Sequence, residues 1–190
     1  MGKTSLKMMI LSALFCAIIA VCAQISITFL PPVPFTMQNF AVALTVVILG
    51  RRYGTLAILL YILVGAIGVP VFAKFNAGLP VLVGPTGGYL IGYIVSAFVM
   101  GTMIDRGKLT FMKAFIVNIV GLAIIHVAGV IQLKLVGSMT WDKAIGIDIT
   151  FILPDLIKII LASYIGIQVR RRLALAGLLP NSLNNEKIVA

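Results

Sequence analysis

Long apolar segments recur along the whole chain and are separated only by short connections rich in glycine, proline or basic residues. A transmembrane helix needs about 20 mostly apolar residues, so a chain of 190 residues can hold about six of them. With 61% hydrophobic and 11% charged residues and a mean hydropathy of +1.16, the chain is too apolar for a soluble domain. We therefore predict an all-α integral membrane protein, with a single six-helix domain over residues 1–172 and a short cytoplasmic tail over residues 173–190. The expected helices cover approximately residues 8–29, 37–49, 55–69, 85–104, 111–133 and 154–172.

The distribution of lysine and arginine predicts how these helices are oriented, because cytoplasmic loops are enriched in both residues. With the N-terminus inside, the inner segments carry eleven of them and the outer segments carry three. We therefore expect both termini in the cytoplasm of a prokaryotic cell and a multi-pass protein in the cytoplasmic membrane. The first apolar run of about twenty residues exceeds the 7–15 of a signal peptide, so it is expected to remain as a span. The inner set is Lys3, Lys7, Arg51, Arg52, Arg106, Lys108, Lys113, Arg170, Arg171, Arg172 and Lys187, and the outer set is Lys74, Lys134 and Lys143.

Asp155 and Lys158 lie inside the last long apolar segment, F-I-L-P-D-L-I-K-I-I-L-A-S-Y. A lone charge in hydrocarbon costs roughly 2.5–3.5 kcal/mol on insertion scales. Spaced three residues apart on a helix, the two side chains can contact each other or one small zwitterionic or dipolar ligand. A self-neutralising pair and a functional site both remain open, and the second is favoured because ionisable groups inside membranes usually serve function. We expect Pro154 at the first position of this helix, with Asp155 in its first turn and residues 141–153 as a short interfacial piece.

Several classes of function lack their sequence signatures. The chain contains no G-x-x-x-x-G-K-[ST] motif and is therefore not expected to bind ATP through a P-loop. His126 is the single histidine, which excludes a histidine-rich metal site and favours a packed, hydrogen-bonded helix residue. Although the net charge is +10, the basic residues lie at segment ends, so no nucleic-acid partner is expected. Neither an enzyme nor a cofactor is predicted.

Two connections on the expected outer side have an unusual composition. Residues 31–39 are apolar and rich in proline, which favours a stiff extended segment. Residues 71–89 contain four glycines, two prolines and a single asparagine, and glycine allows the backbone to approach a ligand closely. Because the helix beginning at Pro154 starts on the same side, these segments together predict a small-molecule pocket open to the exterior. The alternative is that the loops merely pack on the bundle.

Four segments resemble BioY, the biotin-specific S component of energy-coupling-factor vitamin transporters. They are P-P-V-P-F-T-M-Q (31–38), Y-I-L-V-G-A-I-G-V-P-V-F-A (61–73), G-P-T-G-G-Y-L-I-G-Y (84–93) and P-D-L-I-K (154–158). The resemblance covers nearly the whole chain and is weakest after Arg172. It implies a six-helix bundle of the S-component type, capture of biotin outside the cell, and partnership with a transmembrane T component and two ATPase subunits. ATP would then be bound only by the partner subunits.

The candidate ligand residues suit biotin, which has an apolar bicycle, a ureido group with two N–H donors and one carbonyl acceptor, and a carboxylate. Asp155 and Asn76 can accept from the ureido N–H groups, and Asn76 can also donate to the carbonyl. Lys158 can donate to the ureido oxygen or pair with the carboxylate, and the sequence does not decide between these roles. The candidates to cover the rings are Phe35, Tyr89 and Tyr93, and Gln38 and Gly88 complete the predicted ligand set.

Ala13 and Ala17 lie one helical turn apart in the first span, and such small residues permit close approach of another helix. In S components, an Ala-x-x-x-Ala face of this kind resembles the docking surface for the T component. Three alternatives to biotin capture remain open. They are an S component for another small vitamin, an integral-membrane enzyme using Asp155 and Lys158 as acid and base, and a structural subunit.

Overall fold

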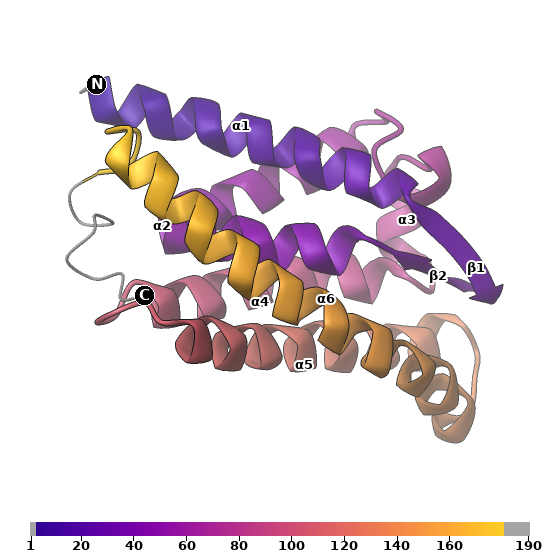
Figure 1. The fold of residues 1–190 in the computed structure, drawn as a ribbon. Coiled ribbons are helices and arrows are strands. Elements are labelled where there is room, and N and C mark those ends of the chain that lie inside the picture. The colour runs from indigo at the N-terminus through magenta and orange to yellow at the C-terminus, as the bar shows by residue number, and fades with distance from the viewer. Residues whose placement is uncertain (1–2, 181–190) are drawn as a thin grey trace.

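The computed structural model describes residues 3–180, which form a bundle of helices with a small β-hairpin at one end (Figure 1). In chain order the elements are α1 (Lys3–Gln24), β1 (Ser26–Leu30), β2 (Val33–Thr36), α2 (Gln38–Ala66), a 3-10 helix η1 (Ala73–Phe75), α3 (Leu79–Val83), α4 (Gly87–Ile104), α5 (Phe111–Val136) and α6 (Trp141–Leu175). The start of α1 and the end of α6 lie at one end of the bundle, and the hairpin lies at the other (Figure 1). Lys7 Nζ donates to the carbonyl of Gly177 at 3.2 Å, which joins the start of α1 to the segment after α6. Part of the predicted tail, residues 181–190, lies outside the described residues.

The helix α2 is broken in the middle, as the predicted boundary between the second and third spans required. Gly50 has φ 68° and ψ −166°, a conformation that residues with a side chain rarely adopt. The chain reverses at Gly50, as a hydrogen bond between the two halves of α2 shows. Gln38, at the start of the first half, donates to the hydroxyl of Tyr61 in the second half at 2.7 Å. Asp105 accepts a hydrogen bond from the backbone N–H of Arg51 at 3.1 Å and so caps the second half. Counting both halves of α2, the described chain contains the six predicted helical passes.

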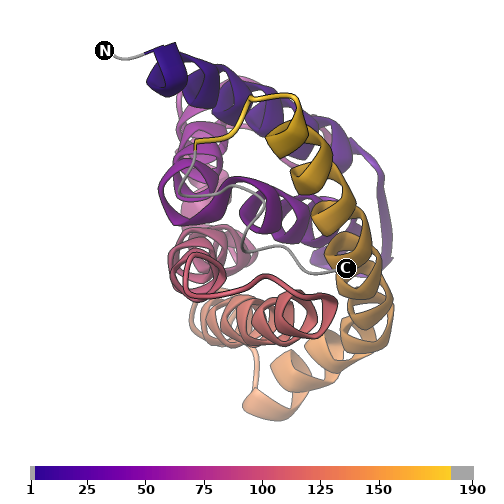
Figure 2. The same cartoon turned by 60° about the vertical axis from the view of Figure 1, so that its left-hand side comes forward.

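The first half of α2 forms the centre of the bundle. Every residue from Ala41 to Gly50 is buried, as expected for a helix that is apolar on all sides. Figure 2 shows this helix surrounded by α1, α4 and α6. By length and composition, α1, α4 and α5 could each cross a membrane, and α2 is as apolar over its 29 residues although it reverses at Gly50. The second half of α6 lies along the same bundle (Figure 2).

The first helix is shorter than predicted, since α1 ends at Gln24 and not near residue 29. Residues 26–30 instead form β1, which pairs antiparallel with β2 through Ser26 opposite Thr36 and Ile27 opposite Phe35. The segment after Gln24 is rich in β-branched residues, with Ile25, Ile27 and Thr28, which favour a strand. Proline at positions 31 and 32 then prevents a helix from continuing. The extended conformation predicted for residues 31–39 is confirmed for β2.

The last helix is longer than predicted. It runs without interruption from Trp141 to Leu175 and contains Pro154, so the expectation that Pro154 begins the helix is wrong. Thr140 caps the true start by accepting from the N–H of Lys143. The buried positions that follow, Ala144, Ile147, Asp148 and Phe151, have the spacing of one helical face. Asp155 therefore lies in the middle of a helix, where the dipole of a helix start cannot stabilise its charge.

Glycines allow α4 and α5 to pack closely. A Cβ atom on Gly88 would lie 2.2 Å from the carbonyl oxygen of Ala128, and one on Gly129 would lie 2.2 Å from the ring of Tyr89. Small residues at helix contacts are the usual means of association within a bilayer, where apolar burial adds little. Gly88 therefore serves the contact between the two helices.

We predict that Gly88→Ala lowers the thermal unfolding temperature of the purified protein in detergent. The added methyl group would meet backbone, which cannot rotate away, and overpacking of this kind costs about 1–3 kcal/mol. Gly146→Ala in α6 is the matched control, because a Cβ there would meet nothing within 4 Å. The control should unfold at the wild-type temperature or above it, since alanine favours helix by roughly 0.5–1 kcal/mol. Equal unfolding temperatures for Gly88→Ala and the wild type would contradict the close contact.

Candidate functional site

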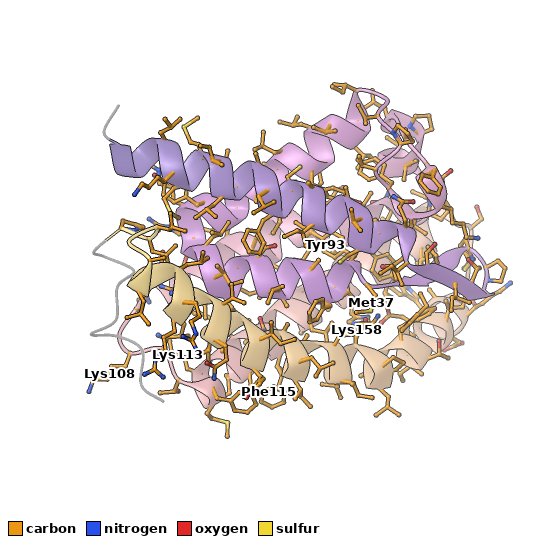
Figure 3. All side chains as sticks on the ribbon, turned by 45° about the horizontal axis from the view of Figure 1, so that its top comes forward. Met37, Tyr93, Lys108, Lys113, Phe115 and Lys158 are labelled. Atoms are coloured by element: carbon orange, nitrogen blue, oxygen red, sulfur yellow. The ribbon has the colours of Figure 1, made fainter. Side chains whose placement is uncertain are left out.

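A cavity of about 220 Å³ opens at the hairpin end of the bundle. Its lining comes from β2, the start of α2, the loop before α3, and the facing sides of α4, α5 and α6. Figure 3 shows Lys158 inside the protein beside Met37 and close to the hairpin, whereas Lys108 and Lys113 lie at the opposite end. Seven of the eight predicted ligand residues line this cavity: Phe35, Gln38, Asn76, Tyr89, Tyr93, Asp155 and Lys158. The eighth, Gly88, packs against α5 and is not among the lining residues.

The buried pair of Asp155 and Lys158 lies in the wall of the cavity. Asp155 is 2% exposed and Lys158 is 5% exposed. Lys158 Nζ donates to Asp155 Oδ1 at 2.7 Å and to the backbone carbonyl of Thr36 at 2.6 Å. The same ammonium lies 3.6 Å from the ring centroid of Phe35, a favourable cation–π contact. The ammonium is thus held by a carboxylate, a carbonyl and an aromatic face.

The second oxygen of Asp155 is held by a residue that the sequence did not single out. Asn39 Nδ2 donates to Asp155 Oδ2 at 2.5 Å, and the hydroxyl of Tyr93 donates to Asn39 Oδ1 at 2.8 Å. Asn39 lies at the start of α2, directly after the hairpin. Its amide orients the carboxylate toward the cavity, and Tyr93 fixes the orientation of the amide.

His126 connects the cavity to a further buried carboxylate. His126 Nδ1 lies 2.7 Å from Asp148 Oδ1, and the hydroxyl of Tyr89 donates to the same oxygen at 2.8 Å. His126 Nε2 lies 3.3 Å from Asp155 Oδ2 without hydrogen-bonding geometry. The expectation of a hydrogen-bonded histidine is confirmed, but this one also lines the cavity. Asp148 precedes Asp155 by seven residues and therefore lies on the same face of α6. This relation is not apparent from the sequence if the helix is expected to start at Pro154, because Asp148 then lies outside it.

Gln38 and Asn76 both line the cavity, but their side chains are hydrogen-bonded to different extents. Gln38 Nε2 donates to the hydroxyl of Tyr61, which in turn donates to the carbonyl of Val71 at 3.2 Å. This chain joins the two halves of α2 to the loop that follows them. Asn76 is exposed, and its Nδ2 donates to the carbonyl of Ala73 at 2.9 Å. The side-chain oxygen of Asn76 can therefore face a ligand at the mouth of the cavity.

The arrangement favours a small organic ligand over a metal ion. Among residues 3–180, no group of three or more His, Cys, Asp or Glu side chains is arranged to hold a metal. The walls are apolar and aromatic, with Phe35 stacked on Phe151 at a centroid distance of 6.5 Å. A few convergent polar groups in such walls are the usual composition of a small-molecule pocket. Carboxylate and amide oxygens there suit a ligand that carries N–H donors.

Ala13 and Ala17, the predicted docking residues, are both exposed on α1 and do not line the cavity. The residue between them on the opposite face, Phe15, is buried against the bundle. The small face thus points outward, as a surface for another membrane helix requires.

Comparison with known proteins agrees with this geometry. Residues 1–175 match the BioY family. The biotin transporter BioY of Thermotoga maritima is 43% identical over 167 residues, which cover 87% of this chain and 97% of that protein. The biotin transporter BioY2 of Lactococcus lactis subsp. cremoris is 40% identical over 179 residues, which cover 92% and 96%. The crystal structure of the S component for biotin from an ECF-type ABC transporter superimposes with a TM-score of 0.82 at 26% identity, covering 90% of this chain and 94% of that one. The chain therefore belongs to the BioY family.

Proposed function

We propose that the chain is the high-affinity biotin-binding subunit of an energy-coupling-factor uptake transporter, and that the cavity at the hairpin end is its biotin site. The observation that carries this proposal is the buried pair of Asp155 and Lys158 in the cavity wall. Buried ionisable groups within a membrane bundle are costly and usually belong to a ligand path. The named biotin transporters among the relatives supply the identity of the ligand.

The ureido group of biotin is assigned to the buried end of the cavity. Asp155 offers it an ionised acceptor whose orientation is already fixed by Asn39 and Lys158. A hydrogen bond to a charged group contributes more than one between neutral groups. Tyr93 and Phe35 would cover the rings of the ligand from either side, and Asn76 is placed at the mouth.

The partners of the chain are a transmembrane T component and two ATPase subunits, which bind and hydrolyse the ATP. The cavity lies at the hairpin end of the bundle, and this end is opposite to the start of α1 and the end of α6 (Figure 1). With both termini in the cytoplasm, as the lysine and arginine distribution favours, the cavity faces the exterior. Biotin is thus captured outside, and the energy for its uptake comes from the partners.

Other functions fit the observations less well. The relatives are named transporters, and the matching crystal structure is a transporter component, which argues against a membrane enzyme. Binding of another small vitamin would need a ligand with a similar pattern of N–H donors. The relatives are named biotin transporters, which favours biotin over another vitamin as the ligand.

We predict that the purified chain alone binds biotin and that Asp155→Asn weakens this binding about tenfold to a hundredfold, because a charge-assisted hydrogen bond contributes about 1.5–3 kcal/mol. Equilibrium binding of labelled biotin to the detergent-solubilised protein measures both affinities. Asp142→Asn is the matched control, since Asp142 is exposed in the first turn of α6. Its affinity should equal that of the wild type.

Asp155→Asn also leaves Lys158 buried without its counter-ion, which can destabilise the fold. A double variant, Asp155→Asn with Lys158→Met, removes both charges and separates the two effects. It should unfold at a higher temperature than the single variant and still bind biotin weakly. Wild-type affinity in a folded Asp155→Asn protein would exclude Asp155 from the site.

We also predict that replacing both Ala13 and Ala17 with leucine abolishes assembly with the T component without altering biotin binding. Larger side chains prevent the close helix contact on which association in lipid depends. Co-purification with the energising module and uptake of labelled biotin by cells measure assembly and transport. Ala123→Leu is the control, because Ala123 is exposed on α5. If the double variant assembles and transports normally, the docking surface lies elsewhere.

A further inference from the structure

We propose that Lys74, at the mouth of the cavity, binds the carboxylate of the ligand. This inference rests on the proposed function and adds an orientation to it. The ring system lies deep in the cavity, and the acidic tail points toward the mouth. It also assigns the role of Lys158, whose partner in the ligand the sequence left open.

Lys158 has no position left for a carboxylate. Its ammonium already contacts Asp155 Oδ1 at 2.7 Å, the carbonyl of Thr36 at 2.6 Å and the ring of Phe35 at 3.6 Å. Two of the three N–H donors of the ammonium are thus used by oxygens, and the ring of Phe35 covers the ammonium on a further side. A ligand carboxylate would have to displace Asp155, which would leave a buried anion without its partner. Lys158 is therefore a structural cation that holds Asp155 ready for the ligand.

His126 is unsuited to a carboxylate for a related reason. Its two ring nitrogens lie 2.7 Å from Asp148 Oδ1 and 3.3 Å from Asp155 Oδ2. A third carboxylate in this position would face two others in a buried environment of low dielectric, where like charges repel strongly. The deep part of the cavity can thus accept N–H groups but opposes an anion.

Lys74, unlike Lys158 and His126, is a cation that a ligand carboxylate can reach. It lines the cavity, its side chain is exposed, and no carboxylate of the described residues forms an ion pair with it. Among residues 3–180, the cavity-lining residues that can carry positive charge are Lys74, Lys158 and His126. An anion at the mouth would therefore find an available ammonium there.

The loop that carries Lys74 is held in a conformation that is unusual for residues with side chains. Lys74 has φ 60° and Phe75 has φ 57°, both in the left-handed region. Gln24, the last residue of α1, fixes this loop by donating to the carbonyls of Val71 and Phe72 and accepting from the N–H of Phe75. Strained backbone of this kind persists where surrounding contacts enforce it, and it often accompanies ligand binding. Here it places the lysine at the cavity edge.

The test compares biotin with its neutral primary amide on the purified protein. Wild-type protein should bind biotin about fivefold more tightly than the amide, as expected for a partly exposed ion pair. Lys74→Asn removes the charge with a residue that tolerates the left-handed region. It should lose this preference by weakening biotin binding while leaving the affinity for the amide unchanged. Lys74→Arg should keep the preference.

The control is Lys143→Asn, which removes an exposed lysine from the first turn of α6 and should keep the wild-type preference. A preference that persists in Lys74→Asn overturns the proposal, as does an equal loss for both ligands, which would indicate damage to the loop. If the wild type binds biotin and its amide equally, the carboxylate is not recognised and the proposal is also wrong. If the wild type binds neither ligand, the proposed function itself fails.

Discussion

The neutralisation of Asp155 inside the bundle is the constraint on which the site depends. An ionised carboxylate in a low-dielectric interior is tolerated only with an opposite charge and further hydrogen bonds. Three separate elements meet this requirement: Lys158 from α6, Asn39 from the start of α2, and the Thr36 carbonyl, which β2 supplies to the lysine. The hairpin, the central helix and the last helix are thereby held together at one point, and that point is the wall of the cavity.

The same contacts explain why this end of the molecule is preorganised. Tyr93 holds Asn39, and Tyr89 holds Asp148, so each residue that orients the deep groups is itself hydrogen-bonded. Binding then requires little ordering of side chains, which lowers its entropic cost. The loop over the cavity is held as well, because the side chain of Gln24 bonds to its backbone and Tyr61 donates to the carbonyl of Val71. Contacts among the protein's own residues therefore hold both the floor of the cavity and the loop at its mouth.

The sequence predicted the parts of this architecture that depend on local pattern. The apolar segments, the break near Gly50 and the pairing of Asp155 with Lys158 follow from composition, glycine and helical spacing. The continuous α6 was missed because Pro154 looked like a helix start, although the buried stripe before it has helical spacing. Asn39 and His126 were not assigned to the cavity because their partners lie 116 and 22 residues away in the sequence. Contacts at such separation depend on how the helices pack, and one sequence does not specify that packing.

The position of α1 connects the two surfaces that transport requires. Its outward face carries Ala13 and Ala17, and its last residue, Gln24, fixes the backbone of residues 71–75. A T component bound at the small-residue face would therefore contact the same helix that holds the cavity mouth. By contrast, the deep groups of the cavity come from α2, α4, α5 and α6, which pack against one another. Under the proposed function, docking of the T component would therefore act on the helix that holds the mouth and not on the helices that carry the proposed ring-binding groups.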